Sequence, residues 1–346
     1  MTSQQQQAAD RITEAVQMGE SELLVWAVCG AGKTEMLFPG IAEALSLGKR
    51  VCIATPRADV VRELIPRLRS SFAQTNVQGL YGGAEKKDSV SQLTISTTHQ
   101  LLRYQNAFEV LVIDEVDAFP YHKDPSLPYA ADRAITHRST TIYLTATPRK
   151  NQYRRIRRHS LPHFFVPLRF HGHPLPVPLL KMCGTLKKEL KEKKFPSSFL
   201  HWLPTRQNPD RQLLIFVPTI DMAEELKLTW ETSNIQSGWT VASVHASDPA
   251  REEKVHAFRY RQLDVLITTT ILERGVTFPS VDVSVLDAGH EVFDEAALIQ
   301  ISGRAGRSPD DPDGEVLFFH DGKTDAMVQA VRNIRKMNNR GRGYRP

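Results

Sequence analysis

The sequence has few cysteines, and none of them lies in a metal-binding pattern. Cys29, Cys52 and Cys183 are three in number, so they cannot all pair with one another, and no two of them have the CxxC spacing of a zinc site. They support neither a disulfide framework nor a metal centre. Such cysteine usage is typical of a protein in a reducing cytosol.

Long apolar runs are also missing. No run approaches the ~18 residues that are needed to span a bilayer. The polar start of the chain, residues 1–10, lacks the apolar core of a signal peptide. We therefore expect a cytoplasmic protein whose only route to the inner face of the membrane is through partner proteins.

The chain has only a small excess of positive charge, +5 over 346 residues, but its basic residues are clustered. One cluster spans residues 149–158, and another forms the tail, residues 332–346. A single cluster of this kind is usually a solvated surface. Two clusters, together with the motifs described below, favour binding to a polyanion.

Short apolar runs alternate with amphipathic stretches in both halves of the chain. The apolar runs include "LLVW", "VCIAT", "LTIST", "VLVI" and "TTIYLT" in the first half, and "QLLIF", "TVASV", "DVLIT", "VDVSVL" and "GEVLFF" in the second. This alternation predicts an α/β fold in which helices cover both faces of parallel sheets. The length favours two domains. We place them at residues 1–150 and 151–346. The segment 149–210 is rich in proline and charge; its start is the expected junction, and most of the rest is expected to open the second domain.

A phosphate-binding loop follows the first apolar run. Residues 27–34, "AVCGAGKT", match the pattern GxxxxGK[ST] except that alanine replaces the first glycine, and a helical stretch follows them as the motif requires. Gly30 and Gly32 let the backbone turn its amides toward phosphates. Lys33 would reach the β- and γ-phosphates of ATP, and the Thr34 hydroxyl would bind Mg²⁺. The alternative, a glycine-rich turn with a solvated lysine, leaves this strand and helix context unexplained.

Two carboxylates follow a second apolar run, in "VLVIDEVD". Asp114 would hold the Mg²⁺, directly or through water. Glu115 would orient and deprotonate the attacking water. An Asp-Glu pair after a strand is common on its own, but its combination with the phosphate loop is a strong signal for nucleotide hydrolysis.

Two arginines lie between glycines in "QISGRAGRS", residues 300–308. A guanidinium group suits a phosphate, and phosphoryl transfer needs cations around the transferred group. We therefore expect Arg304 and Arg307 to act as arginine fingers, each of which is worth roughly 10³–10⁵ in rate. On this hypothesis they lack partners within their own half of the chain. The alternative is that the pair caps the C-terminus of a helix.

Seven motifs occur in the order that is found in superfamily 2 helicases and translocases, which the chain resembles over almost its whole length. They are residues 27–34, "ATPR" at 54–57, "STTHQLL" at 96–102, "DEVD" at 114–117, "TAT" at 145–147, "TTTILERGVTFP" at 268–279 and "QISGRAGR" at 300–307. The sequence around and between the motifs is more closely similar to the ComFA family of late-competence ATPases from naturally transformable bacteria. The primosomal helicase PriA is a more distant relative.

This resemblance implies two RecA-like lobes in tandem, with ATP and Mg²⁺ in the cleft and single-stranded DNA across the top. It implies that Gln5 or Gln6 recognises adenine, and the "QQQQ" tract leaves the register between them open. It further implies that Ala31 and Gly275 contact the nucleotide and that Gln300 belongs to the catalytic set.

The same resemblance implies contacts to the DNA backbone from both lobes. The residues that match these motifs are Thr55, Arg57, Thr98, His99, Thr219 and Thr270. Hydroxyl groups at strand ends suit contacts that ignore base identity, although ordinary strand propensity explains any single threonine equally well. Thr145 and Thr147 match the motif that couples hydrolysis to movement of the lobes.

Three features depart from the relatives. Ile301 stands where many of them have an arginine, and Thr277 replaces an aspartate that many use on the ribose. ComFA proteins usually carry an N-terminal zinc module with four cysteines, and this chain has no such cysteines. It is either a shortened version or a shorter natural form, and we expect no zinc in it.

These observations predict an ATPase that is driven by single-stranded DNA and translocates during DNA uptake, with the membrane uptake channel and other competence proteins as partners. One alternative is a PriA-like replication-restart or repair helicase, although no strand-separating pin is evident. Another is a nucleotide-switched clamp that binds nucleic acid without moving. RNA also stays open as the substrate, because backbone contacts distinguish it poorly from DNA.

Overall fold

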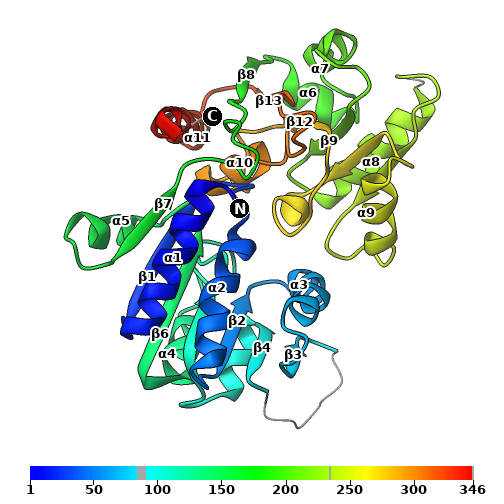
Figure 1. Ribbon diagram of the computed structural model, residues 1–346. Coiled ribbons are helices and arrows are strands. Elements are labelled where there is room, and N and C mark those ends of the chain that lie inside the picture. The colour runs from blue at the N-terminus through cyan, green and yellow to red at the C-terminus, as the bar shows by residue number, and fades with distance from the viewer. Residues whose placement is uncertain (84–90, 234, 345–346) are drawn as a thin grey trace. The chain divides into compact units, whose positions relative to one another are not determined.

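The computed structural model describes residues 1–83, 91–233 and 235–344, so the last two residues of the basic tail lie outside the described chain. It divides into two compact units, Met1–Phe170 and His171–Pro346 (Figure 1). Each unit is built around one parallel sheet, as the alternation of apolar runs and amphipathic stretches predicted.

The first unit contains a seven-stranded parallel sheet in the order β3-β4-β2-β5-β6-β1-β7. Its strands are β1 (Glu22–Ala27), β2 (Val51–Thr55), β3 (Val77–Leu80), β4 (Leu93–Thr97), β5 (Phe108–Ile113), β6 (Ile135–Thr145) and β7 (His163–Val166). Its helices are α1 (Ser3–Met18), α2 (Lys33–Ser46), α3 (Ala58–Ser71), η1 (Thr98–Arg103), α4 (Ser126–Ala134) and α5 (Lys150–Arg157). Helix α1 packs along α2 (Figure 1). Side chains of η1 and α4 form a separate apolar cluster with those of β2 and β5.

Residues 151–170, which we had placed in the second domain, lie in the first unit. Strand β7 pairs with β1. At the end of β7, the Val166 carbonyl accepts from the Val28 amide over 3.1 Å, and beyond the strand the Phe170 amide donates to the Gly30 carbonyl over 2.9 Å. These long-range hydrogen bonds attach the segment to the phosphate loop, and a sequence pattern gives no sign of such pairing.

The second unit contains a six-stranded parallel sheet in the order β10-β11-β9-β12-β13-β8. Its strands are β8 (Leu179–Met182), β9 (Gln212–Phe216), β10 (Val241–Val244), β11 (Val265–Thr268), β12 (Val281–Leu286) and β13 (Val316–His320). Its helices are α6 (Leu186–Lys191), α7 (Ser197–Trp202), η2 (Leu203–Thr205), α8 (Ile220–Thr232), α9 (Arg251–Arg259), η3 (Thr270–Leu272), α10 (Glu295–Ser302), α11 (Asp325–Gly341) and η4 (Arg342–Tyr344). Phe199, Trp202 and Phe319 pack in the aromatic part of its core.

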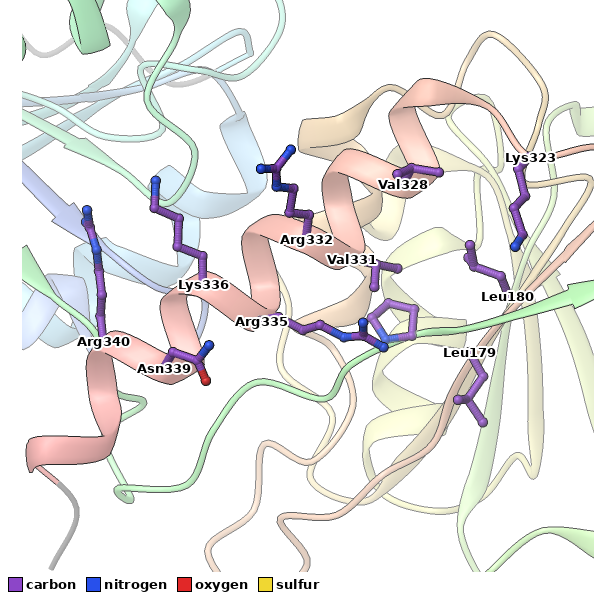
Figure 2. Close-up of a pocket in the computed structure, with 11 residues that line it drawn as sticks. Leu179, Leu180, Lys323, Val328, Val331, Arg332, Arg335, Lys336, Asn339 and Arg340 are labelled. Carbon is purple, nitrogen blue, oxygen red and sulfur yellow. The ribbon is translucent and has the colours of Figure 1, made fainter.

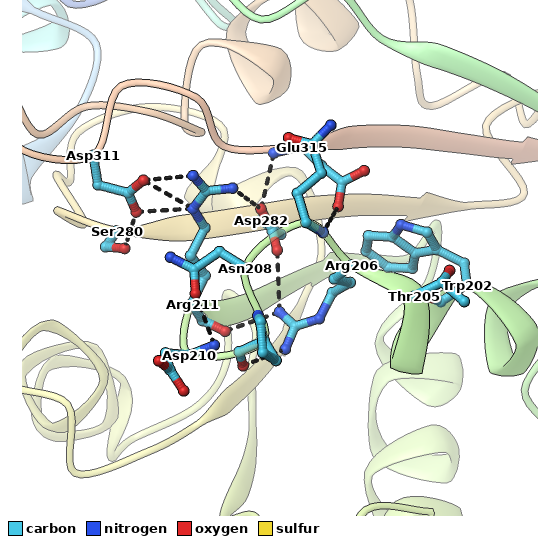
Figure 3. A network of polar contacts seen from close by, with 12 residues as sticks. Trp202, Thr205, Arg206, Asn208, Asp210, Arg211, Ser280, Asp282, Asp311 and Glu315 are labelled. Carbon is cyan, nitrogen blue, oxygen red and sulfur yellow. Dashed lines mark hydrogen bonds and ion pairs between the residues drawn. The ribbon is translucent and has the colours of Figure 1, made fainter.

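A buried ion-pair network ties three segments of the second unit together (Figure 3). Asp282 on β12 is fully buried and accepts hydrogen bonds from Arg206 at 3.1 Å and Arg211 at 3.3 Å. The Nε atom of Arg211 also donates a hydrogen bond to Asp311 Oδ2 over 2.8 Å. Burial raises the pKa of Asp282, whereas the hydrogen bond from Arg211 lowers the pKa of Asp311. The network therefore anchors the loop that follows the "GRAGR" segment.

Within the described ranges, no helix has both the length and the apolar character that crossing a bilayer requires. The same residues contain no group of three or more His, Cys, Asp or Glu side chains that could hold a metal ion. A magnesium ion that is bound mainly through a nucleotide needs no such group, since it keeps several waters and takes one or two protein ligands.

Candidate nucleotide-binding site

The phosphate loop joins the end of β1 to the start of α2. Gly30 and Gly32 have φ values of 78° and 73°, in the left-handed region that favours glycine. No side chain caps the N-terminus of α2, which begins at Lys33. The first amides of the helix are therefore available to an anion, and the helix dipole favours negative charge there.

Gln5 on α1 contacts this loop directly. Its Nε2 donates to the Ala31 carbonyl over 3.0 Å, and its Oε1 accepts from the Thr2 amide over 2.7 Å. A Cβ atom at Gly32 would lie 2.4 Å from Gln5 Nε2, so only glycine leaves room for this approach. Gln6 is exposed and donates instead to Asp10 over 2.8 Å. Of the two glutamines left open by the sequence, Gln5 is the one at the loop.

Asp114 and Glu115 follow β5, next to the phosphate loop. The Asp114 amide donates to Ala54 on β2 over 2.8 Å, which fixes where the acidic pair leaves the sheet. Burial and the Glu115 carboxylate raise the pKa of Asp114, and the Lys33 ammonium group opposes this rise. The Lys33 ammonium group and the Glu115 carboxylate thus both act electrostatically on Asp114.

Glu115 has two features of a reactive group. Its φ of 52° lies in the left-handed region, which is uncommon for a residue with a side chain. Its Oε2 is buried and has no hydrogen-bond partner among the described residues. A buried carboxylate oxygen without a donor is costly, and it is suited to accept a proton from a ligand or a water molecule.

Asp117 connects the acidic pair to the end of β6. Its two carboxylate oxygens accept hydrogen bonds from the hydroxyl groups of Thr145 and Thr147, each over 2.6 Å. Its backbone carbonyl accepts from the Arg149 guanidinium group. We had assigned a coupling role to both threonines but none to Asp117. The third acidic residue of "DEVD" was the signal that could have indicated it.

Arg169 is a second residue that the sequence motifs did not single out. It is buried, and its Cδ would lie 3.3 Å from a Cβ atom at Gly30. Its side chain therefore supports the phosphate loop from the segment after β7. An arginine that directly follows a short apolar stretch, in "FFVPLRF", was the available signal.

In the second unit, Arg304 holds the segment that contains Gly275. Its Nε and Nη2 donate to the Glu273 carbonyl over 3.0 and 2.6 Å, and its Nη1 donates to the Val276 carbonyl. Gly275, with a φ of 76°, lies between these two acceptors. Our expectation that Arg304 lacks a partner in its own half is wrong, because its buried guanidinium group needs acceptors and finds them in this loop.

Arg307 also has partners in its own unit but is less buried than Arg304. Its Nε donates over 2.8 Å to the carbonyl of Gly303, the C-cap residue of α10, and its Nη1 donates over 3.2 Å to the Thr277 hydroxyl. The expectation of no partner is therefore wrong for Arg307 as well, and the helix-capping alternative describes one of its contacts. Gln300 is buried on α10.

The predicted DNA contacts of the first unit lie at the ends of two adjacent strands. Thr55 ends β2, and Thr98 directly follows β4. Both threonines are fully buried, and their hydroxyl groups have no partner in the described chain. Arg57 forms an ion pair with Asp59 at 2.6 Å. His99 is exposed, so it is the most accessible of the contacts predicted for the first unit.

The predicted DNA contacts of the second unit show a similar arrangement. Thr219 follows β9, and Thr270 follows β11, which is the neighbouring strand. Thr219 is exposed and caps α8 by accepting a hydrogen bond from the Met222 amide over 3.2 Å. Thr270 is half-buried at the start of η3. Each unit thus brings its predicted contacts to one end of its sheet.

Known proteins match this chain along both units. The family described as "Type III restriction enzyme, res subunit" matches residues 1–150, and the "Helicase conserved C-terminal domain" matches residues 193–309. Competence protein ComFA of Bacillus subtilis is 48% identical over 338 residues, covering 98% of this chain and 72% of that protein. Competence protein ComFA of Streptococcus pneumoniae is 38% identical over 340 residues, covering 98% and 77%.

Among solved structures, S. cerevisiae Dbp5 bound to RNA and ADP BeF3 is similar to this chain, with a TM-score of 0.72 and 17% sequence identity. The match covers 97% of this chain and 88% of that one. At this identity the likeness concerns the fold alone. Each unit is a RecA-like lobe, and the prediction of two such lobes in tandem is confirmed.

Proposed function

Because the chain belongs to the ComFA family, we propose that it is a DNA-stimulated ATPase that moves along single-stranded DNA during DNA uptake in natural transformation. Its two helicase-type domains support nucleotide hydrolysis. The observation that carries the proposal is the end of β5, where the buried Oε2 of Glu115 has no partner in the described chain and the neighbouring Asp114 feels the charge of Lys33 from the phosphate loop.

The residues around the phosphate loop fit ATP and Mg²⁺. When bound, these groups supply the phosphoanhydride that is hydrolysed and a cation that neutralises its charge. The amides of Gly30 and of residues 32–34 would bind phosphate oxygens together with the Lys33 ammonium group, while Ala31, whose amide donates to the Val28 carbonyl over 3.1 Å, would hold the turn of the loop. The Thr34 hydroxyl and the Asp114 carboxylate are the oxygen donors that Mg²⁺ prefers. Gln5, already held against the loop, would recognise the base.

Hydrolysis itself would use Glu115 as the base and cations of the second lobe as stabilisers. Glu115 would accept the proton of the attacking water at its buried Oε2. We assign the finger role to Arg307, since Arg304 is committed to the loop around Gly275. Arg304 is then a positioning residue for that loop, and Gln300 stays a proposed member of the catalytic set.

The response to DNA would depend on the strand ends of both lobes. We assign direct backbone contacts to Arg57, His99, Thr219 and Thr270, which are less buried than the two remaining threonines. Thr55 and Thr98 would act by shaping the loops that carry those contacts. Asp117, through Thr145 and Thr147, would transmit changes at the acidic pair to the end of β6.

The test is the ATPase rate of the full chain with single-stranded DNA, duplex DNA and RNA compared side by side. Strong stimulation by single-stranded DNA alone is expected. Equal stimulation by RNA would contradict the substrate assignment. No stimulation by any nucleic acid, with intact basal hydrolysis, would contradict the whole proposal.

Oligonucleotide length separates translocation from the clamp alternative. For a motor, the ATPase rate should rise with the length of the strand before it levels off, because each binding event then supports more steps. For a static clamp, the rate should saturate as soon as one site is filled. Unwinding of a forked duplex would favour the PriA-like helicase alternative. Membrane uptake-channel and competence proteins stay proposed partners on the strength of the family name.

A further inference from the structure

A groove of about 890 Å³ lies between β8 and α11 in the second unit (Figure 2). Its apolar lining consists of Pro178, Leu179, Leu180, Val328 and Val331. Leu179 and Val328 remain 61% and 44% exposed, so part of the apolar lining of the groove is open to solvent. We call this feature the β8–α11 groove.

Strand β8 is the edge strand of its sheet and pairs, within the described chain, only with β13. Adjacent residues of a strand point to opposite faces, yet Leu179 and Leu180 both line the groove. The groove therefore reaches around the free edge of β8. Unpaired backbone groups at such an edge are able to bind an added strand.

Cations surround the apolar lining. Arg332, Lys336 and Arg340 are spaced four residues apart and form a row along α11, while Arg335 points toward the chain that enters β8 (Figure 2). Lys323 adds a further cation at the other end of the groove. The lining, all of it within the described chain, includes no carboxylate. Like charges four residues apart on a helix repel each other, so the pair of Arg332 and Lys336 favours an external anion.

Two ordinary explanations account for only part of this pattern. Cations near a helix C-terminus complement the helix dipole, but that effect is confined to the last turn and therefore reaches Arg340 and not Arg332. Solvation explains isolated charges, but it does not explain an exposed apolar floor beside them. Lys323, Arg332, Arg335 and Lys336 form no ion pair with any residue that the structure describes.

The chemistry of the groove distinguishes between anionic partners. Single-stranded nucleic acid is bound through cations together with aromatic side chains on which bases stack, and none of the lining residues is aromatic. An apolar floor with a cationic rim and a free strand edge instead matches a peptide that alternates apolar and acidic residues. We propose that the β8–α11 groove docks an acidic segment of a partner protein, with apolar side chains on Val331 and Leu180 and carboxylates on the α11 cations.

The test uses a fluorescent peptide of about eight residues, the length of an ordinary strand, in which leucine and glutamate alternate. Fluorescence anisotropy measures its affinity for the full chain. The double variant Arg335→Glu/Lys336→Glu should weaken binding about tenfold or more, and Val331→Asp should do the same. The matched control Lys188→Glu/Lys191→Glu reverses two exposed cations of α6, outside the groove, and should leave the affinity unchanged.

Basal ATPase activity should be unchanged in all of these variants, because none of the substituted residues belongs to the nucleotide site. An all-glutamate peptide should bind about tenfold more weakly than the alternating one, since it lacks apolar side chains. The proposal would be overturned if the alternating peptide did not bind. It would also be overturned if the peptide bound the wild type and the Arg335→Glu/Lys336→Glu variant with equal affinity. The proposal would also be overturned if the Arg335→Glu/Lys336→Glu variant lost its binding to oligothymidylate or to phosphatidylserine vesicles but kept its affinity for the peptide.

Discussion

The side chain of Gln5 donates a hydrogen bond over 3.0 Å to the carbonyl of Ala31, and so connects the first helix of the chain to the phosphate loop. The glutamine is held in place by its capping box with Thr2. The glycine at position 32 leaves space for its amide group. The orientation of Gln5 is therefore fixed by the protein before any nucleotide binds.

Replacing Gln5 should weaken ATP binding without changing the fold. Gln5→Ala removes a hydrogen bond at the loop, which is worth about 0.5–1.5 kcal/mol, so we expect an increase of ~2–10-fold in the Kd for ATP. Gln6→Ala is the matched control, since the Gln6 side chain donates to Asp10 and not to the phosphate loop. Equal effects of the two substitutions, measured by calorimetry, would contradict the assignment of Gln5.

Glu115→Gln should retain ATP binding but lose hydrolysis. The amide keeps the size of the side chain but cannot accept the proton of the attacking water, so we expect kcat to fall by about 10²–10⁴. Lys33→Ala should instead abolish both ATP binding and turnover, because it removes the cation beside the phosphates. Normal single-turnover hydrolysis by Glu115→Gln would eliminate Glu115 as the base.

Thr145→Val should uncouple hydrolysis from DNA. The substitution removes the hydrogen bond that buried Asp117 accepts from the Thr145 hydroxyl, at a cost of about 0.5–1.5 kcal/mol. We expect the basal ATPase rate to survive while the stimulation by single-stranded DNA falls, as measured by the ratio of the two rates. Thr147→Val removes the matching hydrogen bond to the other oxygen and should have the same effect. A parallel loss of basal and stimulated rates would point to a purely structural role.

Arg304 and Arg307 should differ when each is replaced by alanine. Arg304→Ala removes the hydrogen bonds that its guanidinium group donates to the Glu273 and Val276 carbonyls, and we expect a loss of about 1–3 kcal/mol in the stability of the second unit. Arg307→Ala should leave the unfolding midpoint nearly unchanged and reduce DNA-stimulated kcat by about 10³ or more. Urea unfolding and ATPase assays on both variants check this, and the reverse pattern would assign the finger to Arg304.

Acid should weaken the network around Asp311. Its hydrogen bond with Arg211 lowers the pKa of Asp311 in the folded state, so the contribution of Asp311 to stability is present above the unfolded pKa of about 3.9 and is lost as the pH falls through the folded value. Asp311→Asn should therefore have a lower free energy of unfolding than the wild type at pH 7, and the difference between the two should narrow below about pH 4. Asp310→Asn, at the exposed neighbouring position, is the control. A gap that is independent of pH would exclude a contribution from this titration.

Much of the nucleotide site could be predicted because its signals are local in sequence. The phosphate loop, the acidic pair after β5 and the alternation of strands with helices each depend on residues close together in the chain. The sequence alone therefore determined the RecA-like fold, the order of the motifs and the candidate residues for phosphate, magnesium and proton transfer.

Only the tertiary structure decided how these residues are held. It distinguished Gln5 from Gln6, because neighbouring residues of a helix point in different directions. It also brought Asp117 to Thr145 and gave Arg304 its carbonyl acceptors, and these contacts join segments that are remote in sequence. It also moved residues 151–170 into the first unit, since β7 completes the first sheet by pairing with β1. Pairing between distant strands depends on which surfaces remain to be covered after the core has formed, and no local pattern of residues encodes that.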